Sequence, residues 1–215
     1  MTAQQPLSDI RREYGSRTLS EEQMPKDPIE QFKRWFDEII AEEIEPTAMT
    51  LATVDPTGMP NARIVLLKGT DEGKFAFYTD YESAKGREIT HSPQVALNFF
   101  WAKYSRQVRI RGTIEKISSE ISDAYFASRP LSSQISAVAS EQSTTLVCRK
   151  VLEERVDALS HYFVDGIPVP RPEHWGGYAV LPVEIEFWQG RDNRLHDRIR
   201  YVKHNSIWTI ERLSP

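Results

Sequence analysis

The sequence predicts a mainly β protein with additional helices, in which an antiparallel sheet closes into a barrel and the helices pack outside it. Short runs rich in β-branched and aromatic residues recur along the chain, separated by turn sequences such as DPTG and GTDEG. The helical stretches do not alternate regularly with these runs, which disfavours a doubly wound parallel sheet. Closure of the sheet is expected because it removes the exposed edges of many short strands.

The N-terminal part divides into a polar segment and a helix. Residues 1–25 are polar with little periodicity, so we expect a mobile N-terminal segment there and one barrel domain over residues 26–215. Asp27 suits an N-cap, Pro28 suits the first helical position, and Glu30 completes a capping box. An amphipathic helix of about four to five turns is predicted over residues 27–44, with an apolar face formed by Ile29, Phe32, Phe36, Ile39 and Ile40.

The first half of the predicted sheet follows this helix. Its strands are expected at residues 48–54, 61–68, 74–79, 94–101 and 106–117. The first three should form a meander, and Ser83 can cap a short helix before the fourth. In the fifth strand Val108 and Ile110 alternate with Arg109 and Arg111, which predicts one covered face and one wet face.

Helices precede the last strands. Ser118 or Ser119 can cap a helix that ends before Pro130, and a loop with a short helix follows. A longer helix is expected from Ser143 to Phe163, with Leu146 and Val147 on its apolar face. The chain then passes through a Pro/Gly-rich connection into three strands, expected at residues 183–190, 194–203 and 207–213.

Composition excludes several classes of protein. The 215 residues carry a formal net charge of −4, so the chain as a whole does not resemble a nucleic-acid or membrane binder. Cys148 is the only cysteine, which rules out an internal disulfide and disfavours a cysteine-based metal site. There is no signal sequence and no run of roughly 20 apolar residues, so we expect a soluble, cytoplasmic protein without a metal. Dinucleotide, P-loop, zinc-protease and serine-hydrolase signatures are absent.

The segment FWQGRDNRLHDR, at residues 187–198, holds the clearest candidate site. On a strand, Arg194, His196 and Arg198 would share one face because alternate residues point the same way. Such a row of cationic or protonatable groups suits an anion, and His196 can exchange a proton near neutral pH. Trp188 would lie across the hairpin, where it could stack on a flat ring. An ordinary solvated strand face is the alternative interpretation.

Three other segments carry residues suited to phosphate. They offer Arg63 and Lys68 on a strand, Thr79, Ser83 and Lys85 around a helix start, and Tyr125, Arg129, Ser132 and Ser133 around a helix end. Helix N-termini and guanidinium groups both bind phosphate oxygens. The alternatives are charged strand ends, a plain N-cap and an arginine placed for the helix dipole. Together these groups indicate a phosphorylated ligand that lacks an adenosine half.

In combination, the motifs RIVLLK, FYT, RQVRIRG, YFASRP, WGG, EFWQG and RLHDR resemble the pyridoxine/pyridoxamine 5'-phosphate oxidase family over nearly the whole chain. The resemblance implies an FMN-binding split β-barrel that works as a homodimer with FMN at the subunit interface. It also implies the FMN-dependent oxidation of pyridoxine 5'-phosphate and pyridoxamine 5'-phosphate to pyridoxal 5'-phosphate. In that reaction, which belongs to vitamin B6 metabolism, O2 is reduced to hydrogen peroxide.

The resemblance also assigns roles to individual residues. It implies FMN contacts for Arg63, Ile64, Val65, Leu66, Leu67, Lys68, Tyr78, Thr79, Lys85, Gln107, Gln142, Ser143, Trp188 and Arg198, with Arg63 and Lys85 on the FMN phosphate. It implies substrate contacts for Arg11, Tyr14, Lys68, Tyr125, Arg129, Ser133, Arg194 and His196. Arg194 and His196 are the implied catalytic residues, near the reacting carbon. Arg11 and Tyr14 match a mobile segment that covers the occupied site in the family.

Two positions depart from the family pattern. The family commonly has arginine where this chain has Ala84, which removes one cation from the expected FMN phosphate site and leaves open whether the nearby Arg87 replaces it. Ser136 stands where glycine is common, a difference that we interpret as conformational. Two other functions are therefore considered: another split-barrel flavin oxidase, such as one from phenazine biosynthesis, and a non-catalytic carrier of FMN or pyridoxal phosphate.

Overall fold

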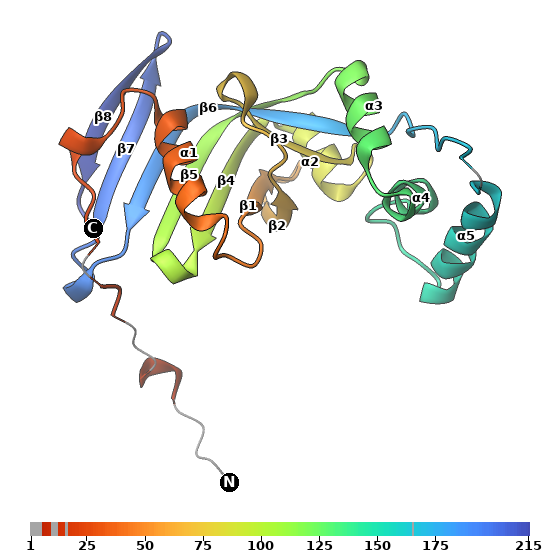
Figure 1. Cartoon of the computed structure of the whole chain (residues 1–215), viewed down its shortest axis with the longest axis horizontal. Helices are drawn as coiled ribbons and strands as arrows, with labels where there is room; N and C mark the ends of the chain where they lie inside the picture. The colour runs from red at the N-terminus through yellow and green to blue at the C-terminus, as the bar shows by residue number, and fades with distance from the viewer. Residues whose placement is uncertain (1–5, 10–12, 16, 165) are drawn as a thin grey trace. The chain divides into compact units, whose positions relative to one another are not determined.

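The computed structural model describes residues 6–9, 13–15, 17–164 and 166–215 (Figure 1). Its contacts divide the chain into two compact units. Unit 1 contains Met1–Pro46, Asn98–Ile110 and Val183–Pro215, and unit 2 contains Thr47–Leu97 and Arg111–Pro182. Three strands contribute residues to both units: β4 (Gln94–Trp101), β5 (Arg106–Lys116) and β6 (Trp175–Gln189).

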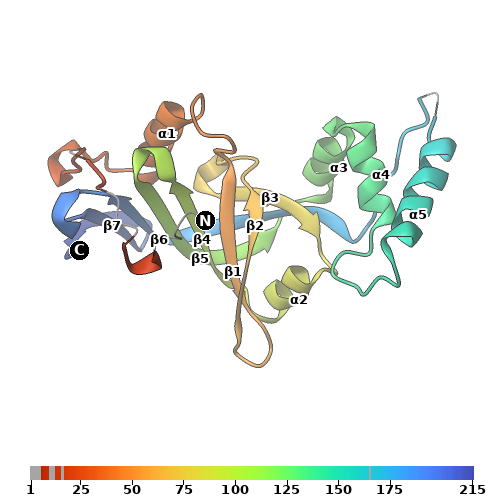
Figure 2. The same cartoon turned by 90° about the horizontal axis from the view of Figure 1, so that it is seen from below.

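Unit 2 is built on an antiparallel barrel. Its own strands are β1 (Ala48–Val54), β2 (Pro60–Leu66) and β3 (Phe75–Asp80), and the strand order is β2-β1-β4-β5-β6-β3. Figure 2 shows β1 and β2 as a long hairpin. The N–H of Lys68 donates to the carbonyl of Ala76 at 2.8 Å, and the N–H of Ala76 donates to the carbonyl of Gly69 at 2.9 Å. Because β3 thus returns to the segment after β2, the expected closure of the sheet is confirmed in unit 2.

The predicted meander is wrong in its third strand. Strand β3 runs antiparallel to β6, with pairs from Phe75↔Val180 to Asp80↔Trp175, and meets the segment after β2 only through Gly69 and Ala76. The turn sequence between β2 and β3 specifies a reversal of the chain, but it does not specify which strand pairs with β3. Strand β6 also begins at Trp175, eight residues before the predicted strand at 183–190.

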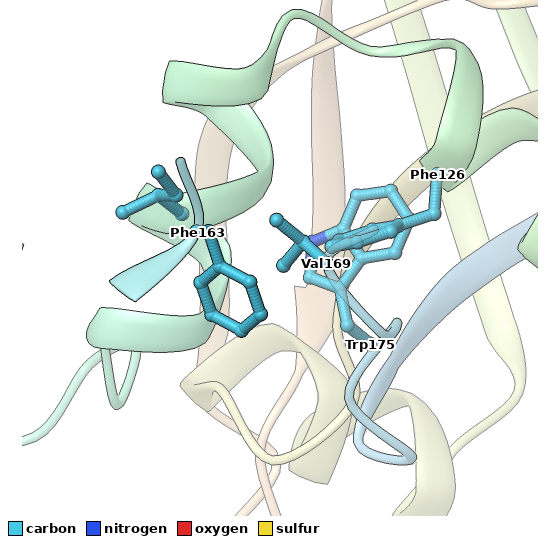
Figure 3. Close-up of a cluster of buried hydrophobic side chains, with 5 residues drawn as sticks. Phe126, Phe163, Val169 and Trp175 are labelled. Atoms are coloured by element: carbon cyan, nitrogen blue, oxygen red, sulfur yellow. The ribbon is translucent and has the colours of Figure 1, made fainter. Parts of the chain in front are cut away.

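Among the described residues of unit 2, the α-helices are α2 (Ala84–His91), α3 (Ser119–Ser128), α4 (Leu131–Ala139) and α5 (Arg149–Tyr162). The Ser83 and Ser118 hydroxyls cap α2 and α3 as predicted, by accepting hydrogen bonds from Gly86 N–H and Ile121 N–H. A buried cluster joins α3 and α4 to the segment between α5 and β6: Phe126, Ile135, Phe163, Val169 and Trp175 (Figure 3). This cluster sets the position of Trp175 at the start of β6.

Helix α5 is shorter than predicted. It begins at Arg149 rather than Ser143, because Ser143 takes a positive φ of 71° and Cys148 is extended with φ −161° and ψ 163°, neither of which an α-helix allows. Leu146 and Val147, expected on its apolar face, lie before the helix and are 42% and 95% exposed. Cys148 is exposed at the N-cap position. The predicted apolar face of this helix was therefore too long.

Unit 1 is an antiparallel sheet covered on one face by a helix. Its strands follow the order β4-β5-β6-β7-β8, with β7 at Asp197–His204 and β8 at Ile207–Leu213. Helix α1 (Pro28–Ile39) packs on this sheet through Phe32 against Phe99 and Trp35 against Phe187, with ring centroids 5.1 and 5.2 Å apart. The opposite face of the sheet carries polar side chains.

The ends of α1 follow from its local sequence. Asp27 caps the helix as predicted, and its carboxylate accepts the N–H of Ile29 at 2.9 Å. The helix ends at Ile39, so the prediction of a helix to residue 44 is wrong, and Ile40 is 53% exposed. Glu42 and Glu43 follow the helix. Their negative charges are unfavourable at the negative end of the helix dipole, so they disfavour a longer helix. Among the described residues, no helix combines the length and apolarity that crossing a membrane requires.

Candidate active site

A cavity of about 460 Å³ in unit 2 contains most of the residues that the sequence suggested for phosphate binding. Its walls come from β2 and the residues after it, from β3, from the start of α2 and from the junction of α3 with α4. The lining residues are Ile64, Val65, Leu66, Lys68, Tyr78, Thr79, Lys85, Tyr125, Arg129, Pro130, Ser133, Gln142 and Trp175. Three are cations and none of these described residues is acidic, so the cavity is suited to an anion.

Arg129 is the cation best prepared for a ligand. Its Nη1 atom is buried and has no hydrogen-bond partner among the described residues. The guanidinium lies over the ring of Trp175, 4.6 Å from the centroid, and burial lowers the pKa of Arg129 below its ordinary value. A buried donor without an acceptor costs about 1–3 kcal/mol. A phosphate oxygen would satisfy this donor and compensate for the buried charge.

The end of α3 places Arg129 in the cavity. Tyr125 and Arg129 are four residues apart and would share one face of a continuous helix, but the helix ends at Ser128 and Arg129 is its C-cap. Pro130 disfavours helical geometry at the residue before it, and Arg129 accordingly has an extended backbone with φ −74° and ψ 152°. Tyr125, Arg129 and Ser133 nevertheless line the same cavity.

Aromatic rings form one wall of this cavity. Tyr78 and Tyr125 stack with centroids 3.7 Å apart, and the ring of Trp175 lies parallel to Tyr125 at 6.3 Å. The glycine after Trp175 lets Tyr81 approach the start of β6, because a Cβ atom on Gly176 would lie 2.2 Å from the Tyr81 hydroxyl. An aromatic wall beside cations fits a flat, phosphorylated ring compound.

Lys85 lies among neutral oxygen atoms. Its Nζ atom donates to Thr79 Oγ1 at 3.0 Å, to Ser83 Oγ at 3.3 Å and to Gln142 Oε1 at 2.5 Å. Burial lowers the pKa of Lys85, and the positive charge of Arg63 lowers it further. An anion would relieve both effects, so the position of Lys85 fits the predicted contact with the FMN phosphate.

Arg63 has a different environment from Lys85. Its Nη2 atom donates to Glu88 at 2.8 Å, and its Nη1 atom donates to the Thr53 hydroxyl and to the carbonyl of Leu51. Burial alone would raise the pKa of Glu88, but hydrogen bonds from Thr53, Asn61 and Arg63 lower it below its ordinary value. Arg63 is therefore held by an ionised carboxylate and does not line the cavity, and its role on the FMN phosphate stays a prediction.

Arg87 lines a different cavity from Lys85. This neighbouring space, of about 480 Å³, is also lined by Asp80, Glu82 and Glu141. The Arg87 guanidinium donates to the carbonyl of Glu82. In this structure Arg87 therefore does not replace the arginine that the family commonly has at the position of Ala84.

Three of the other predicted flavin residues, Gln107, Trp188 and Arg198, lie in unit 1. Trp188 and Arg198 face each other across β6 and β7, and Gln107 lies on β5. Arg198 donates through Nε to Glu186 at 2.7 Å, and Arg109 donates to the same carboxylate at 3.0 Å. These residues form the polar face of the sheet, defined as Gln107, Arg109, Glu186, Trp188 and Arg198.

The prediction that Arg194 and His196 lie on a strand with Arg198 is wrong. Asp192–Arg194 form a 3₁₀ turn, and Asn193 and Arg194 have positive φ values of 55° and 60°. Strand β7 begins only at Asp197. A left-handed turn cannot be read from the alternation of charges, because alternation describes only extended backbone.

The turn instead fixes the ring of His196. Its Nδ1 atom accepts the backbone N–H of Arg191 at 3.0 Å, so the neutral ring carries its proton on Nε2. Burial lowers the pKa of His196, and Arg194 lowers it further. Trp188 and Tyr14 pack on this imidazole, with centroids 4.7 and 5.3 Å away. His196 is thus held as a neutral donor.

The N-terminal segment reaches this turn. The N–H of Gly15 donates to Asp192 at 3.0 Å, and the N–H of Leu19 donates to Asp197 at 3.0 Å. Gly190 allows Tyr14 to approach, because a Cβ atom there would lie 2.8 Å from the Tyr14 ring. Tyr14 therefore packs on Trp188 and His196, and its substrate contact and the mobility of residues 1–25 both stay predictions.

Besides Arg63, three predicted site residues are not placed in the cavity lining, on the polar face or at the turn before β7. The side chain of Leu67 is buried at 6% exposure, outside the cavity lining. Ser143 is exposed, with its backbone in the left-handed region. Arg11 lies outside the described residues.

Sequence reasoning also missed two residues, Trp175 and Glu186. Trp175 forms part of the cavity wall, and the WGG motif was the signal that could have identified it. Glu186 is only 3% exposed, and nothing in the sequence distinguished it from a solvent-exposed glutamate of the strand.

An antiparallel split barrel with a cationic, aromatic-walled cavity is typical of the FMN-binding split-barrel proteins, and this chain is one of them. Residues 36–163 match the family described as pyridoxamine 5'-phosphate oxidase. Residues 175–215 match the one described as the pyridoxine 5'-phosphate oxidase C-terminal dimerisation region. The chain therefore belongs to the pyridoxamine 5'-phosphate oxidase family, whose cofactor is FMN.

Curated relatives of the same family are similar to this chain over nearly its full length. A pyridoxine/pyridoxamine 5'-phosphate oxidase from Legionella pneumophila (strain Paris) is 56% identical over 97% of each chain. The protein of the same name from Pseudomonas paraeruginosa is 50% identical, over 98% of this chain and 99% of the relative.

Solved structures agree with the fold. PhzG from Burkholderia lata 383, in complex with tetrahydrophenazine-1-carboxylic acid, has a TM-score of 0.86 at 30% identity, and the match covers 92% of this chain and 98% of PhzG. A pyridoxamine 5'-phosphate oxidase-related, FMN-binding protein from Nostoc punctiforme has a TM-score of 0.72 at 18% identity, covering 89% of this chain and all of that protein. The prediction of an FMN-binding split barrel is confirmed.

Proposed function

We propose that this protein oxidises pyridoxine 5'-phosphate and pyridoxamine 5'-phosphate to pyridoxal 5'-phosphate, with FMN as cofactor and O2 as the final electron acceptor. The observation that carries the proposal is the buried, unpartnered Nη1 of Arg129 beside an aromatic wall, which fits the phosphate and the ring of such a substrate. The full-length relatives bear the name of this activity.

The chain's residues would bind and orient both reactants. Lys68, Tyr125, Arg129 and Ser133 would hold the substrate phosphate, because all four line the cavity. Lys85 would hold the FMN phosphate, and Gln107, Trp188 and Arg198 would contact the flavin. When bound, FMN supplies the chemistry by accepting a hydride from the substrate's C4' carbon and passing electrons to O2, which yields hydrogen peroxide.

His196 would act as a hydrogen-bond donor rather than as a base. Its Nδ1 atom is occupied by the backbone N–H of Arg191, so only the Nε2–H is available to the substrate. Arg194 would lie over the pyridine ring and keep His196 neutral through its positive charge. Both groups position and polarise the reactants, which lowers the entropic barrier of a reaction between two bound rings.

We further propose a homodimer in which FMN lies at the subunit interface. The match of residues 175–215 to a dimerisation region supports the dimer. The expectation of a cytoplasmic location is retained as a prediction. Equilibrium sedimentation of the protein loaded with FMN tests the assembly, and a monomer at micromolar concentration would contradict it.

The visible spectrum of the protein loaded with FMN tests the activity. Under anaerobic conditions, pyridoxamine 5'-phosphate should bleach the flavin, and admission of O2 should restore its colour and release hydrogen peroxide. A non-catalytic carrier would bind the substrate without bleaching. An oxidase of phenazine precursors would not respond to this substrate.

A further inference from the structure

Glu186 is a buried carboxylate to which neither the sequence nor the family match assigns a role. It lies on β6 with 3% of its surface exposed. Charged residues are rarely buried to this degree unless they are paired. Here both carboxylate oxygens are paired: Oε1 accepts Nε–H of Arg198 at 2.7 Å, and Oε2 accepts Nη1–H of Arg109 at 3.0 Å.

The contacts of Arg198 fix the plane of its guanidinium. Glu186 holds Nε, and the carbonyl of Ser214 accepts the Nη1–H at 2.9 Å. These two anchors lie on different sides of the group, so rotation about the last side-chain bonds would break one of them. Nη2 carries no hydrogen bond to any described residue, so it is free to donate to a ligand.

The sheet register places this pair beside Trp188. Trp188 lies directly opposite Arg198 in the β6–β7 ladder, and Glu186 precedes Trp188 by two residues, on the same face. Glu186 is therefore the diagonal neighbour of Arg198, within reach of a long side chain. The carboxylate, the indole and the guanidinium form one contiguous group on the polar face.

We propose that Glu186 is a positioning residue that orients the Arg198 guanidinium for contact with the flavin. The proposal rests on the proposed function, in which Arg198 contacts FMN. Glu186 itself does not touch the flavin in this scheme. It acts by holding Arg198 in one rotamer, so that the arginine loses little conformational entropy when FMN binds.

A double-mutant cycle on FMN binding tests this role. The dissociation constant of FMN is measured by quenching of flavin fluorescence for the apo forms of the wild type, Glu186→Gln, Arg198→Gln and the double variant. Each single substitution should weaken binding by about tenfold, the effect of one charge-assisted hydrogen bond. The double variant should bind no more weakly than the weaker single variant, because both remove the same contact.

Glu184→Gln is the matched control. Glu184 lies two residues earlier on β6 and pairs with Arg200 at 3.7 Å, away from Arg198. This variant should bind FMN like the wild type. Thermal unfolding of each apo variant checks the fold. If Glu186→Gln does not fold, Glu186→Asp replaces it in the cycle, since it keeps the charge but is too short to hold Arg198.

Two results would overturn different statements. If Arg198→Gln leaves FMN binding unchanged, Arg198 does not contact the flavin, and that part of the proposed function fails. If Arg198→Gln weakens binding but the Glu186 variant does not, or if the two effects multiply in the double variant, the positioning role of Glu186 is wrong and Arg198 keeps its place.

Discussion

The cations of the unit 2 cavity and those of the unit 1 polar face differ in their partners. In the cavity, within the described part of the chain, Arg129 has an unpartnered Nη1 and Lys85 donates only to neutral oxygens. On the polar face, Arg109 and Arg198 share the carboxylate of Glu186. A cation without a carboxylate keeps its charge for an anionic ligand, whereas a paired cation is fixed in direction and partly neutralised.

The cavity cations are thus suited to recognising the charge of a ligand, whereas the cations of the polar face are suited to holding a fixed orientation. The burial that lowers the pKa of Arg129 and of Lys85 would be compensated when a phosphate enters the cavity. The hydrogen bond from Arg198 to Glu186 instead raises the pKa of Arg198, so its protonated form is already stabilised without a ligand. Arg63, which does not line the cavity, is instead paired with Glu88 at 2.8 Å.

Arg129→Gln is expected to have the largest effect. It removes a buried donor and a positive charge from the substrate phosphate, so kcat/KM for pyridoxamine 5'-phosphate should fall by about 100-fold or more. FMN content should not change. Steady-state kinetics with pyridoxamine, which lacks the phosphate, should show little further loss. Arg149→Gln, an exposed position on α5, is the control, and an equal loss for both substrates would contradict the phosphate role.

Arg194→Ala should lower turnover without removing the cofactor. The arginine is expected over the pyridine ring, so its loss disturbs the approach of the two rings and should reduce kcat by about tenfold. Arg200→Ala, on β7 and paired with Glu211, serves as a control. Flavin absorbance of the purified variants measures FMN content beside the kinetics. Unchanged turnover in Arg194→Ala would refute the role of this residue.

The sequence predicted residues of the cavity more successfully than the geometry of the hairpin. Arg129 and Lys85 sit at a helix end and a helix start, where local signals such as Pro130 and the Ser83 cap mark their positions. Arg194 lies in a left-handed turn that charge alternation does not reveal. Local sequence specifies caps and helix ends, but it does not specify the conformation of an irregular turn.

Glu186 and Trp175 show what depends on distant parts of the chain. In an alternating strand Glu186 is indistinguishable from a solvated residue, and its burial depends on Arg109 from β5 and Arg198 from β7. Trp175 joins the cavity because β3 pairs with β6 rather than with β2. The burial of Glu186 and the place of Trp175 in the cavity wall both depend on pairing between strands that are far apart in the sequence. The turn sequences do not specify that pairing.

His196 variants test the orientation of a donor on the hairpin. His196→Gln places an amide N–H near the imidazole Nε2, whereas His196→Asn places it near Nδ1. If Nε2–H is the working donor, the glutamine variant should keep about tenfold more turnover than the asparagine variant. Equal activity of the two variants would contradict the assigned tautomer.

The pH profile gives an independent test of His196. Burial and Arg194 lower the pKa of His196, so the neutral ring persists below about pH 6.5, the ordinary value. Protonation would place a hydrogen on Nδ1 against the N–H of Arg191 and release the fixed ring, so kcat/KM should fall as pH falls through this lowered pKa. Arg194→Ala should move the loss to higher pH, and His196→Gln should abolish it. An acid limb that is unchanged in His196→Gln would belong to another group.

The smallest expected effect concerns Ala84, which tests whether the cavity lacks a cation. Ala84 is the first residue of α2 and is half-buried beside Lys85, while Arg87 lines the neighbouring, more acidic space. An arginine at position 84 should therefore strengthen FMN binding by about twofold to fivefold, the range of a partly screened charge pair. Ala84→Gln adds length without charge and should leave the dissociation constant nearly unchanged. If the wild type already binds FMN as tightly as Ala84→Arg, the cavity does not need the extra cation, and the unpaired cations of unit 2 alone are sufficient for the phosphate.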